Sequence, residues 1–338
     1  MFLLEGFIII NLIRSVIPQL DIQMKKTGKI GIAAGAAAVI IILLVLLFPR
    51  LRNNSSELDL RIYDYRDTRH LVSLTAKAAR LLEKQGEAAL DEFRNHPEEW
   101  SASRESYLYV YDLNGTNLFH GGYPELEGEN LRDFTDLLGK KVSSQIMDEL
   151  KNPDDLNPHN WVHYLWLPPG ALDPVWKASC NFPAALPEGR RVYVGSGIDN
   201  PPQEKEFYRI IVDKAAKLIE DEGEAALEIL QNPASIYVIY DQAVFVFDRN
   251  GSALIDPGIK LLTERNLYNY SDITGRYPLK ELNERLKDSS SAWVITMERS
   301  ETGGRPVKKG VYGRVAKMDG KEVVVGSICP LPEPAWMR

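Results

Sequence analysis

The stretch ARLLEKQGEAAL at residues 79–90 returns as AKLIEDEGEAAL at residues 216–227, which is 137 positions further along the chain. In each copy a segment with apolar residues at helical spacing ends at a glycine, Gly86 or Gly223, and a Glu-Ala-Ala-Leu run follows. Self-similarity at a fixed spacing is the sequence signature of repeated folding units. The stretch therefore predicts two copies of one domain, each beginning with a long helix that ends at its glycine.

Further motifs repeat in the same order downstream of this stretch. VYDLNG at residues 110–115 is matched by VFDRNG at 246–251, and VYVGS at 192–196 is matched by VVVGS at 323–327. The shorter matches between them pair Asn130-Leu131 with Asn266-Leu267, Asp136 with Asp272, Trp161-Val162 with Trp293-Val294, and Lys177 with Lys309. The spacing falls from 137 to 131 residues and changes only between motifs. Two tandem copies with loops of different length account for this order.

The composition is that of an ordinary globular protein. The chain has 338 residues, of which 44% are hydrophobic and 26% charged, and this length allows two domains of typical size. A net charge of −7 argues against a nucleic-acid-binding protein, although it equally describes a solvated acidic surface. The two cysteines, Cys180 and Cys329, stand at non-equivalent places in the copies and are too few for a disulfide framework.

An apolar run at residues 30–48 predicts a membrane anchor. It is nineteen residues long, and about twenty apolar residues span a bilayer as a helix. A cleaved signal peptide would have a shorter apolar region and a small-residue cleavage site, which the following Pro-Arg-Leu-Arg does not offer. Three lysines precede the run and two arginines follow it. This modest bias places residues 1–29 in the cytoplasm and everything after about residue 50 outside the membrane.

The segments on both sides of the anchor have separate interpretations. Residues 1–23 are either an upstream extension from a mis-set start codon or a second, weak membrane-associated segment. Residues 49–66 are expected to be the juxtamembrane start of the first long helix, capped near Ser55 or Ser56. The first domain is then expected at residues 67–200, and the second at residues 201–338.

Strand and helix patterns in each copy predict an α+β fold. Alternating and β-rich runs predict strands at residues 107–111, 116–120, 161–167, 175–182 and 191–197, and at 243–247, 252–256, 293–298, 308–315 and 321–327. A further helix is expected within residues 131–150 and near 279–286. Asn114-Gly115 predicts a hairpin turn, because Asn-Gly tolerates positive φ at both turn positions. Each copy is therefore expected to form a five-stranded antiparallel sheet with helices against it.

The ordered motifs of residues 67–200 resemble the single-Cache domain, a PAS-like extracytoplasmic sensor module of bacterial and archaeal chemoreceptors and histidine kinases. The matching residues are Gly128-Glu129-Asn130-Leu131, Asp136, Gly139, Trp161-Val162-His163-Tyr164, Lys177 and Gly195-Ser196-Gly197-Ile198. The family often has a tyrosine three residues after the lysine, where this copy has Cys180. The second copy resembles the same pattern and has Tyr312 at that place. The resemblance implies two tandem sensor domains.

Aromatic residues of the first copy predict a ligand site. Side chains alternate along a strand, so Tyr164 and Trp166 share one face of theirs, and Tyr109 and Tyr111 share one face of another. Aromatic walls with one fixed cation, Lys177, suit a small carboxylate. The full predicted site is Tyr109, Tyr111, His120, Trp161, Tyr164, Trp166 and Lys177. The alternative is that the rings are ordinary core and that the lysine is solvated or salt-bridged.

The second copy predicts a poorer site. A possible second pocket would consist of Asp256, Trp293, Lys309 and Tyr312. An anion beside Lys309 would face Asp256 and Glu298, or the lysine would form an ion pair with one of them. No acid stands at the equivalent places in the first copy, so Lys177 is expected to remain available there. A cationic ligand would reverse this preference.

Catalytic and metal-binding patterns are absent from the sequence. His159 and His163 lie at the start of an expected strand, where a spacing of four does not bring them together, so we predict no metal site and no cofactor. Nucleophile, phosphate-loop and zinc-protease motifs are lacking, so the chain is not expected to be an enzyme. We expect no output domain after the second copy, because no kinase, coiled-coil or methyl-accepting pattern follows it in the sequence. We expect a membrane-anchored sensor that binds a small molecule and signals through a separate protein; the alternative is a surface scaffold or solute-binding protein with no signalling role.

Overall fold

The computed structural model describes residues 58–102, 106–151, 159–168, 171–240, 242–256, 266–300 and 303–331. All helices and strands named below belong to one compact unit, Leu60–Arg338. The expected anchor at residues 30–48 and the segment before it lie outside the described residues. Within the described ranges, no helix combines the length and the apolar character that crossing a membrane requires.

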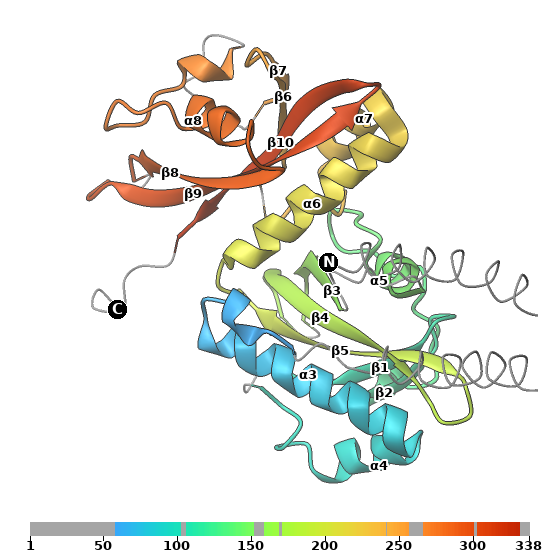
Figure 1. Ribbon diagram of the computed structural model, residues 1–338. Coiled ribbons are helices and arrows are strands. Elements are labelled where there is room, and N and C mark those ends of the chain that lie inside the picture. Colours follow the sequence, from blue (N-terminus) through green and yellow to red (C-terminus); the bar gives the residue numbers. More distant parts are fainter. Residues whose placement is uncertain are drawn as a thin grey trace, which may run out of the picture. The chain divides into compact units, whose positions relative to one another are not determined.

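The first repeat forms a five-stranded antiparallel sheet whose strand order is β2-β1-β5-β4-β3 (Figure 1). Its strands are β1 (Tyr109–Asp112), β2 (Asn117–His120), β3 (Asn160–Trp166), β4 (Val175–Ala185) and β5 (Arg191–Asp199). Its helices are α3 (Arg66–Gln85), α4 (Ala88–Asn95) and α5 (Val142–Lys151), with 3-10 turns at Leu60–Ile62 and Pro124–Leu126. Helix α3 packs against β4 and β5, and α5 packs against β3 and β4.

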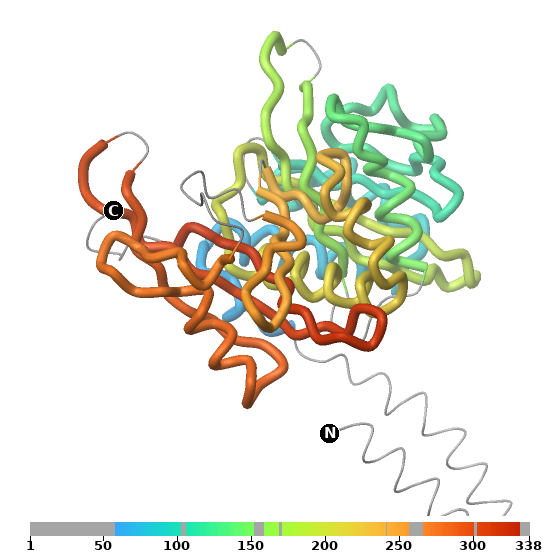
Figure 2. Tube along the Cα trace, turned by 90° about the horizontal axis from the view of Figure 1, so that it is seen from above, coloured from blue at the N-terminus to red at the C-terminus, as the bar shows by residue number. Residues whose placement is uncertain are grey.

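The second repeat forms a sheet of the same kind in the order β7-β6-β10-β9-β8. Its strands are β6 (Phe245–Asp248), β7 (Ala253–Ile255), β8 (Ser291–Glu298), β9 (Val307–Met318) and β10 (Lys321–Pro330). Its helices are α6 (Lys205–Glu222), α7 (Ala226–Gln231) and α8 (Pro278–Arg285), with 3-10 turns at Gly223–Ala225 and Leu267–Asn269. The predicted α+β fold with two five-stranded antiparallel sheets is confirmed. In both sheets the hairpin between the last edge strand and its neighbour, β3–β4 or β8–β9, projects outward (Figure 2).

Both long helices end as the repeated stretch predicts. Gly86 follows α3 with φ 65°, and its N–H donates to the carbonyl of Leu82. Gly223 follows α6 with φ 61°, and its N–H donates to the carbonyl of Ile219. Glycine adopts this left-handed conformation without a Cβ clash, which explains why both copies have it there.

The start of the first long helix differs from the prediction. Helix α3 begins at Arg66 and not near Ser55 or Ser56, which lie outside the described residues. The backbone N–H groups of Asp64 and Tyr65 donate instead to the carboxylate of Glu204, at 2.6 and 2.9 Å. Glu204 belongs to the segment between the two repeats. Because it accepts these two N–H groups, the backbone at Tyr65 is extended and the helix begins only after it.

The Asp-x-Asn-Gly motif forms the same hairpin turn in both repeats. The Oδ1 atom of Asp112 accepts from the N–H groups of Asn114 and Thr116, both at 2.9 Å, and Asp248 makes the equivalent two bonds. Of the central pair, only Gly115 has positive φ, at 99°. The hairpin is therefore confirmed, and the aspartate carboxylate fixes a turn that needs only one left-handed residue.

A second aspartate fastens an edge strand in each repeat. Oδ2 of Asp136 accepts from the N–H of Leu165 on β3 at 3.0 Å, and Oδ2 of Asp272 accepts from the N–H of Met297 on β8 at 3.1 Å. In both cases Oδ1 binds backbone N–H groups of the aspartate's own loop. The repeats thus share individual hydrogen bonds as well as strand order.

Candidate functional site

The face of the first sheet that meets α5 borders a partly open cavity of about 180 Å³. Its walls are formed by Tyr107, Tyr109, Tyr111, His120, Leu126, Leu131, Phe134, Val142, Ser143, Ile146, Tyr164, Trp166 and Tyr193. Five of the seven predicted site residues are among them: Tyr109, Tyr111, His120, Tyr164 and Trp166. No carboxylate belongs to this described lining.

Strand alternation and register bring these rings together. Tyr109 on β1 lies opposite His120 on β2 and opposite Gly195 on β5, so all three positions face the same side of the sheet. A Cβ atom at Gly195 would overlap the ring of Tyr109, so the glycine leaves the room that the ring occupies. The Tyr109 hydroxyl donates to Oδ1 of Asn181 at 2.8 Å, which fixes the ring against the sheet.

The aromatic rings contact one another around the cavity. Centroid distances are 5.0 Å between Tyr107 and His120, 5.7 Å between Tyr109 and Tyr111, and 6.0 Å between Phe134 and Trp166. Edge-to-face and tilted contacts at such distances are favourable. The rings therefore form a continuous wall that can exclude water from a small molecule.

Lys177 is buried beside this wall, but it is not available as predicted. Its side chain is 2% exposed, and Nζ lies 2.8 Å from Oδ1 of Asp199 and 4.8 Å from the ring centroid of Tyr107. Lys177 and Asp199 are direct partners in the β4–β5 register, so their side chains share one face. The expectation that no acid would compete for Lys177 was wrong, because the acid comes from the neighbouring strand and not from an equivalent position of the other repeat.

Trp161 lies on the opposite face of β3 from Tyr164 and Trp166. Its Nε1 donates to the hydroxyl of Tyr63 at 2.9 Å, and its ring lies 4.7 Å from that of Phe207 at the start of α6. An odd-numbered position on this strand faces away from the even-numbered cavity positions. Trp161 therefore belongs to the core between the sheet and the long helices, and its assignment to the ligand site was wrong.

Several wall residues were missed from the sequence. Tyr107 stands two positions before Tyr109, so the same alternation could have identified it. Phe134 and Tyr193 lay in segments to which no site was assigned, and Ser143 looks like an ordinary helix residue. Only the packing of α5 on the sheet places Ser143 in the cavity.

Burial sets the protonation of the cavity groups. It lowers the pKa of His120 to about 4, and the nearby positive charge of Lys177 contributes in the same direction. The imidazole is therefore neutral at pH 7, and its Nδ1 accepts the N–H of Tyr123 at 3.0 Å. Burial also raises the pKa of Tyr111 to about 12 and raises the pKa of Tyr164, so these hydroxyls stay protonated as neutral donors.

The predicted second pocket is not assembled in the second repeat. Trp293 and Tyr312 are cross-strand partners that face α6, and the Tyr312 hydroxyl lies 3.1 Å from Asp213. Lys309 lies at an odd position of β9 and faces the other way, where Nζ pairs with Glu298 at 2.6 Å. Asp256 is exposed beyond β7. The face that corresponds to the cavity is instead filled by Phe245, Phe247, Tyr270, Leu279, Leu282 and their neighbours.

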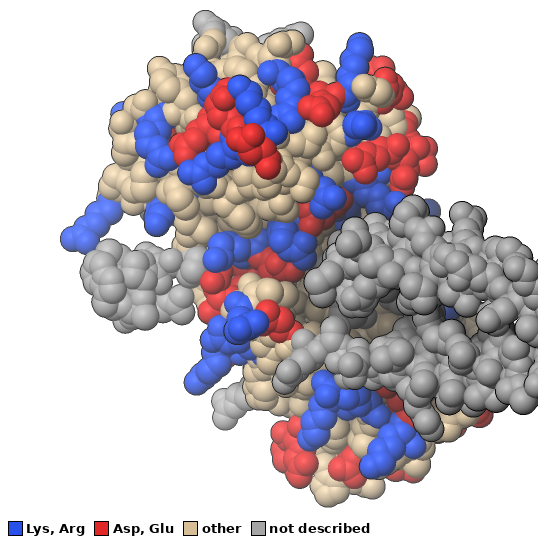
Figure 3. All heavy atoms as spheres, in the orientation of Figure 1, with Lys and Arg blue, Asp and Glu red and all other residues tan. Residues whose placement is uncertain are grey.

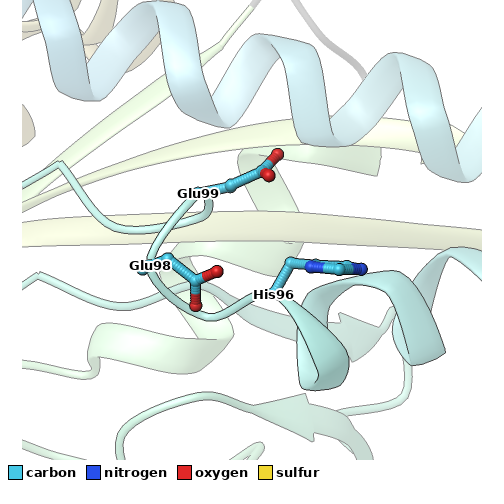
Figure 4. Close-up of side chains that lie close together, drawn as sticks. All are labelled: His96, Glu98 and Glu99. Atoms are coloured by element: carbon cyan, nitrogen blue, oxygen red, sulfur yellow. The ribbon is translucent and has the colours of Figure 1, made fainter.

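The two histidines His159 and His163 interact with different residues. Nε2 of His159 forms a hydrogen bond with the hydroxyl of Tyr63 at 2.8 Å, whereas the ring of His163 packs on the ring of Phe207. A different group of three potential ligands, His96, Glu98 and Glu99, lies in the exposed segment after α4 (Figure 4). The His96 imidazole lies 4.0 Å from Glu92 of α4, and all three residues are exposed, which is common for acidic surface groups.

Surface charge is mixed on the face seen in Figure 3. Lys and Arg side chains there alternate with Asp and Glu over the described elements. Surface ion pairs of the second repeat include Arg276–Glu281 and Lys287–Glu284.

Solved structures with similar chains include sensor domains of chemotaxis proteins. One described as "Periplasmic sensor domain of chemotaxis protein" is 28% identical, with 38% of this chain and 87% of that chain covered and a TM-score of 0.28. One described as "Structural basis for carboxylic acid recognition by a Cache chemosensory domain" is 22% identical, with 45% and 98% covered and a TM-score of 0.32. A methyl-accepting chemotaxis protein from Vibrio parahaemolyticus RIMD 2210633 is 18% identical, with 56% and 96% covered and a TM-score of 0.24.

The family assignment rests on the sequence of the first repeat. No curated protein sequence matches the chain. Residues 65–211, from the start of α3 into α6, match the family model described as Single Cache domain 2. This match contains every strand of the first sheet and every residue that lines the cavity. The resemblance read from the motifs is thereby confirmed, and residues 65–211 of this chain are a single Cache domain.

Proposed function

We propose that the protein is a membrane-anchored extracytoplasmic sensor whose first repeat binds a small molecule and which signals through a separate partner protein. The observation that carries the proposal is the partly open, aromatic-lined cavity within a single Cache domain. Small-molecule sites are typically concave, mostly apolar and supplied with a few polar groups, and this cavity has those properties. The apolar run at residues 30–48 supports the anchor.

A small carboxylate is the ligand class that we favour. The described lining offers tyrosine hydroxyls as neutral donors and contains no carboxylate that would repel an anion. Lys177 contributes little net charge, because Asp199 balances it at 2.8 Å. The polar contacts of the ligand would therefore come mainly from uncharged donors, with the aromatic rings around its carbon chain.

The second repeat is proposed to be a second Cache fold that has no ligand. Its strand order, turn hydrogen bonds and edge-strand aspartate match those of the first repeat. Its inner face is closed by leucine and aromatic side chains. We propose that it serves as a spacer or a relay between the binding domain and the partner protein.

The runner-up function is a surface scaffold or solute-binding protein without a signalling role. The filled second repeat favours it, since a sheet packed in this way can serve purely as structure. Thermal-shift measurements on the full chain in detergent, with a panel of small carboxylates, amines and amino acids, separate the two hypotheses. A ligand that binds the folded state raises the melting temperature by mass action. A flat response over the whole panel would favour the scaffold.

A pair of matched variants locates the site. Trp166→Ala removes a wall of the cavity, whereas Trp293→Ala removes a tryptophan of the second repeat that faces α6. Calorimetry should show that Trp166→Ala weakens binding of any hit at least tenfold and that Trp293→Ala leaves it unchanged. Loss of binding only in Trp293→Ala would place the site in the other repeat.

The proposed location has its own test. Protease added to spheroplasts should degrade both repeats while the cytoplasmic contents stay intact. Protection of both repeats would contradict the extracytoplasmic placement without bearing on ligand binding.

A further inference from the structure

We infer that the first turn of α5, together with the hydroxyl of Ser143, forms the anion-binding end of the cavity and receives the carboxylate of the ligand. This inference rests on the proposed function, because it assigns the recognition of that ligand to particular groups. Lys177, which sequence reasoning chose for this role, is already paired with Asp199.

Helix α5 begins in the wall of the cavity. Its first two residues, Val142 and Ser143, and Ile146 one turn later all belong to the lining. Helical bonding begins with the N–H of Gln145, which donates to the carbonyl of Lys141 at 3.2 Å. The N–H of Val142 belongs to the antiparallel bridge between Thr135 and Lys141, whereas no backbone acceptor is found among the described residues for the N–H groups of Ser143 and Ser144. Such N-terminal groups carry a partial positive charge and bind anions.

An unpartnered hydroxyl at the same turn is the second, independent observation. Ser143 is 7% exposed and lines the cavity, yet its hydroxyl makes no hydrogen bond to any described residue. Tyr164, also 7% exposed, lines the cavity with a hydroxyl in the same situation. A hydroxyl that lines the cavity and has no described protein partner is available to a polar group of a bound molecule.

The charges around this turn tolerate an anion. The buried acid of the preceding loop is Asp136, whose carboxylate accepts from the N–H groups of Leu138, Lys140 and Leu165 at 2.8–3.0 Å. The acids of α5 itself, Asp148 and Glu149, pair with Lys151 and Lys214. The loop of Asp136 also carries the buried cation of Lys140, whose Nζ donates to the carbonyl of His163 at 2.6 Å. Asp199 is balanced by Lys177. The described groups at this end of the cavity thus include no unpaired carboxylate.

The second repeat lacks the hydroxyl of the inferred site. Leu279 stands in place of Ser143 and is fully buried in the core. Pro278 stands where the first repeat has Val142, whose N–H belongs to the loop bridge, so this exchange removes a structural bond and not a free donor. The repeat without a cavity therefore also lacks the serine donor, as expected if Ser143 serves a ligand and not the fold.

The test is calorimetry on the full chain with two probes of similar size and shape, n-butyrate and its uncharged analogue butyramide. Ser143→Ala should weaken butyrate binding by about ten- to a hundredfold, because a hydrogen bond to a charged group is lost. Butyramide binding should change less than threefold. Ser144→Ala, a serine of the same turn that does not line the cavity, should leave both probes unchanged. Ser143→Leu imports the equivalent residue of α8 and should abolish butyrate binding.

The other possible results would overturn the inference, and they show whether the proposed function fails with it. Equal weakening of butyrate and butyramide by Ser143→Ala would make Ser143 a simple wall residue and overturn the inference. Unchanged butyrate binding in Ser143→Ala, with loss in Trp166→Ala, would overturn the inference and leave the proposed binding site intact. If acetate, propionate, butyrate and valerate all fail to bind the wild-type chain, the proposed ligand class is wrong, and the inference fails with it. Melting temperatures of the ligand-free variants verify that each one folds.

Discussion

The two repeats share a scaffold and differ in what fills one face of it. Both have the same strand order, the same Asp-x-Asn-Gly turn and the same aspartate that fastens the edge strand. In the first repeat the face toward α5 borders a partly open cavity, whereas in the second the face toward α8 is packed with apolar side chains. Some cavity residues, such as Tyr111 and Tyr193, belong to the repeated motifs, so the difference between the repeats lies in the side chains that pack on the sheet and not in the motifs alone.

A few positions explain this difference. Leu282 of α8 lies directly on Gly313, where a Cβ atom would approach Leu282 Cδ2 to 2.6 Å, so the helix packs close to the sheet. The first repeat has Asn181 at that strand position, and its side chain is held by Tyr109 and Asn160. In the second repeat, leucines of α8 pack directly on the glycine of β9 and fill the space between helix and sheet. In the first repeat, Asn181 on the sheet and Ser143 on α5 leave that space open.

Acidification should give the largest difference in folding stability between the two repeats, because the protein's five histidines all lie before residue 200. Burial lowers the pKa of His120 and His159 to about 4 and that of His163 to about 3, from an ordinary value of 6.5. The unfolded chain therefore binds protons that the folded chain cannot. Stability is highest above pH 6.5 and falls as the pH drops toward 4, by on the order of 2 kcal/mol per histidine at pH 5.

Urea unfolding at pH 7 and pH 5 tests this prediction. His163→Leu cannot be protonated and should lose about 2 kcal/mol less than the wild type between the two pH values. His96→Leu, at an exposed position, should follow the wild type. The same pH dependence in all three proteins would show that the buried imidazole does not control acid stability.

Substitution of the two equivalent lysines, Lys177 and Lys309, should give the next largest difference in unfolding free energy. Lys177→Met removes one partner of a pair in which the lysine is 2% exposed and leaves Asp199 unpaired, which should cost about 4 kcal/mol of unfolding free energy. Lys309→Met removes one partner of a pair in which both side chains are 22% exposed and should cost less than about 1 kcal/mol. Urea unfolding of both variants measures the difference. Equal losses would mean that the Lys177–Asp199 pair is solvated despite its position.

Leu279 and Ser143 occupy equivalent positions in the first turns of α8 and α5. Their substitutions should give the smallest difference in unfolding free energy among these comparisons. Leu279→Ala should cost about 3 kcal/mol, because Leu279 is fully buried in an apolar core and its removal leaves a void. Ser143→Ala should change stability by less than about 1 kcal/mol, because its hydroxyl bonds to no described residue. Thermal unfolding of the ligand-free proteins compares them. A large loss in Ser143→Ala would indicate that the serine is part of the packing and not of a ligand site.

The sequence by itself determined the features that depend on local chemistry. The repeated stretch predicted both long helices and the glycines that end them, since a left-handed position after an apolar helix selects glycine. Strand alternation placed Tyr109 and Tyr111, as well as Tyr164 and Trp166, on common faces. Those four residues, with His120, are the part of the predicted site that the cavity contains.

Only the tertiary structure decided which residues meet across strands and how closely the helices pack. The pairing of Lys177 with Asp199 follows from the β4–β5 register, and a register is set by contacts between segments that are distant in sequence. Ser143 enters the site because α5 covers the sheet at a particular distance, whereas α8 packs closer over Gly313. Both outcomes depend on side-chain volumes from several elements at once, which no single stretch of the sequence contains.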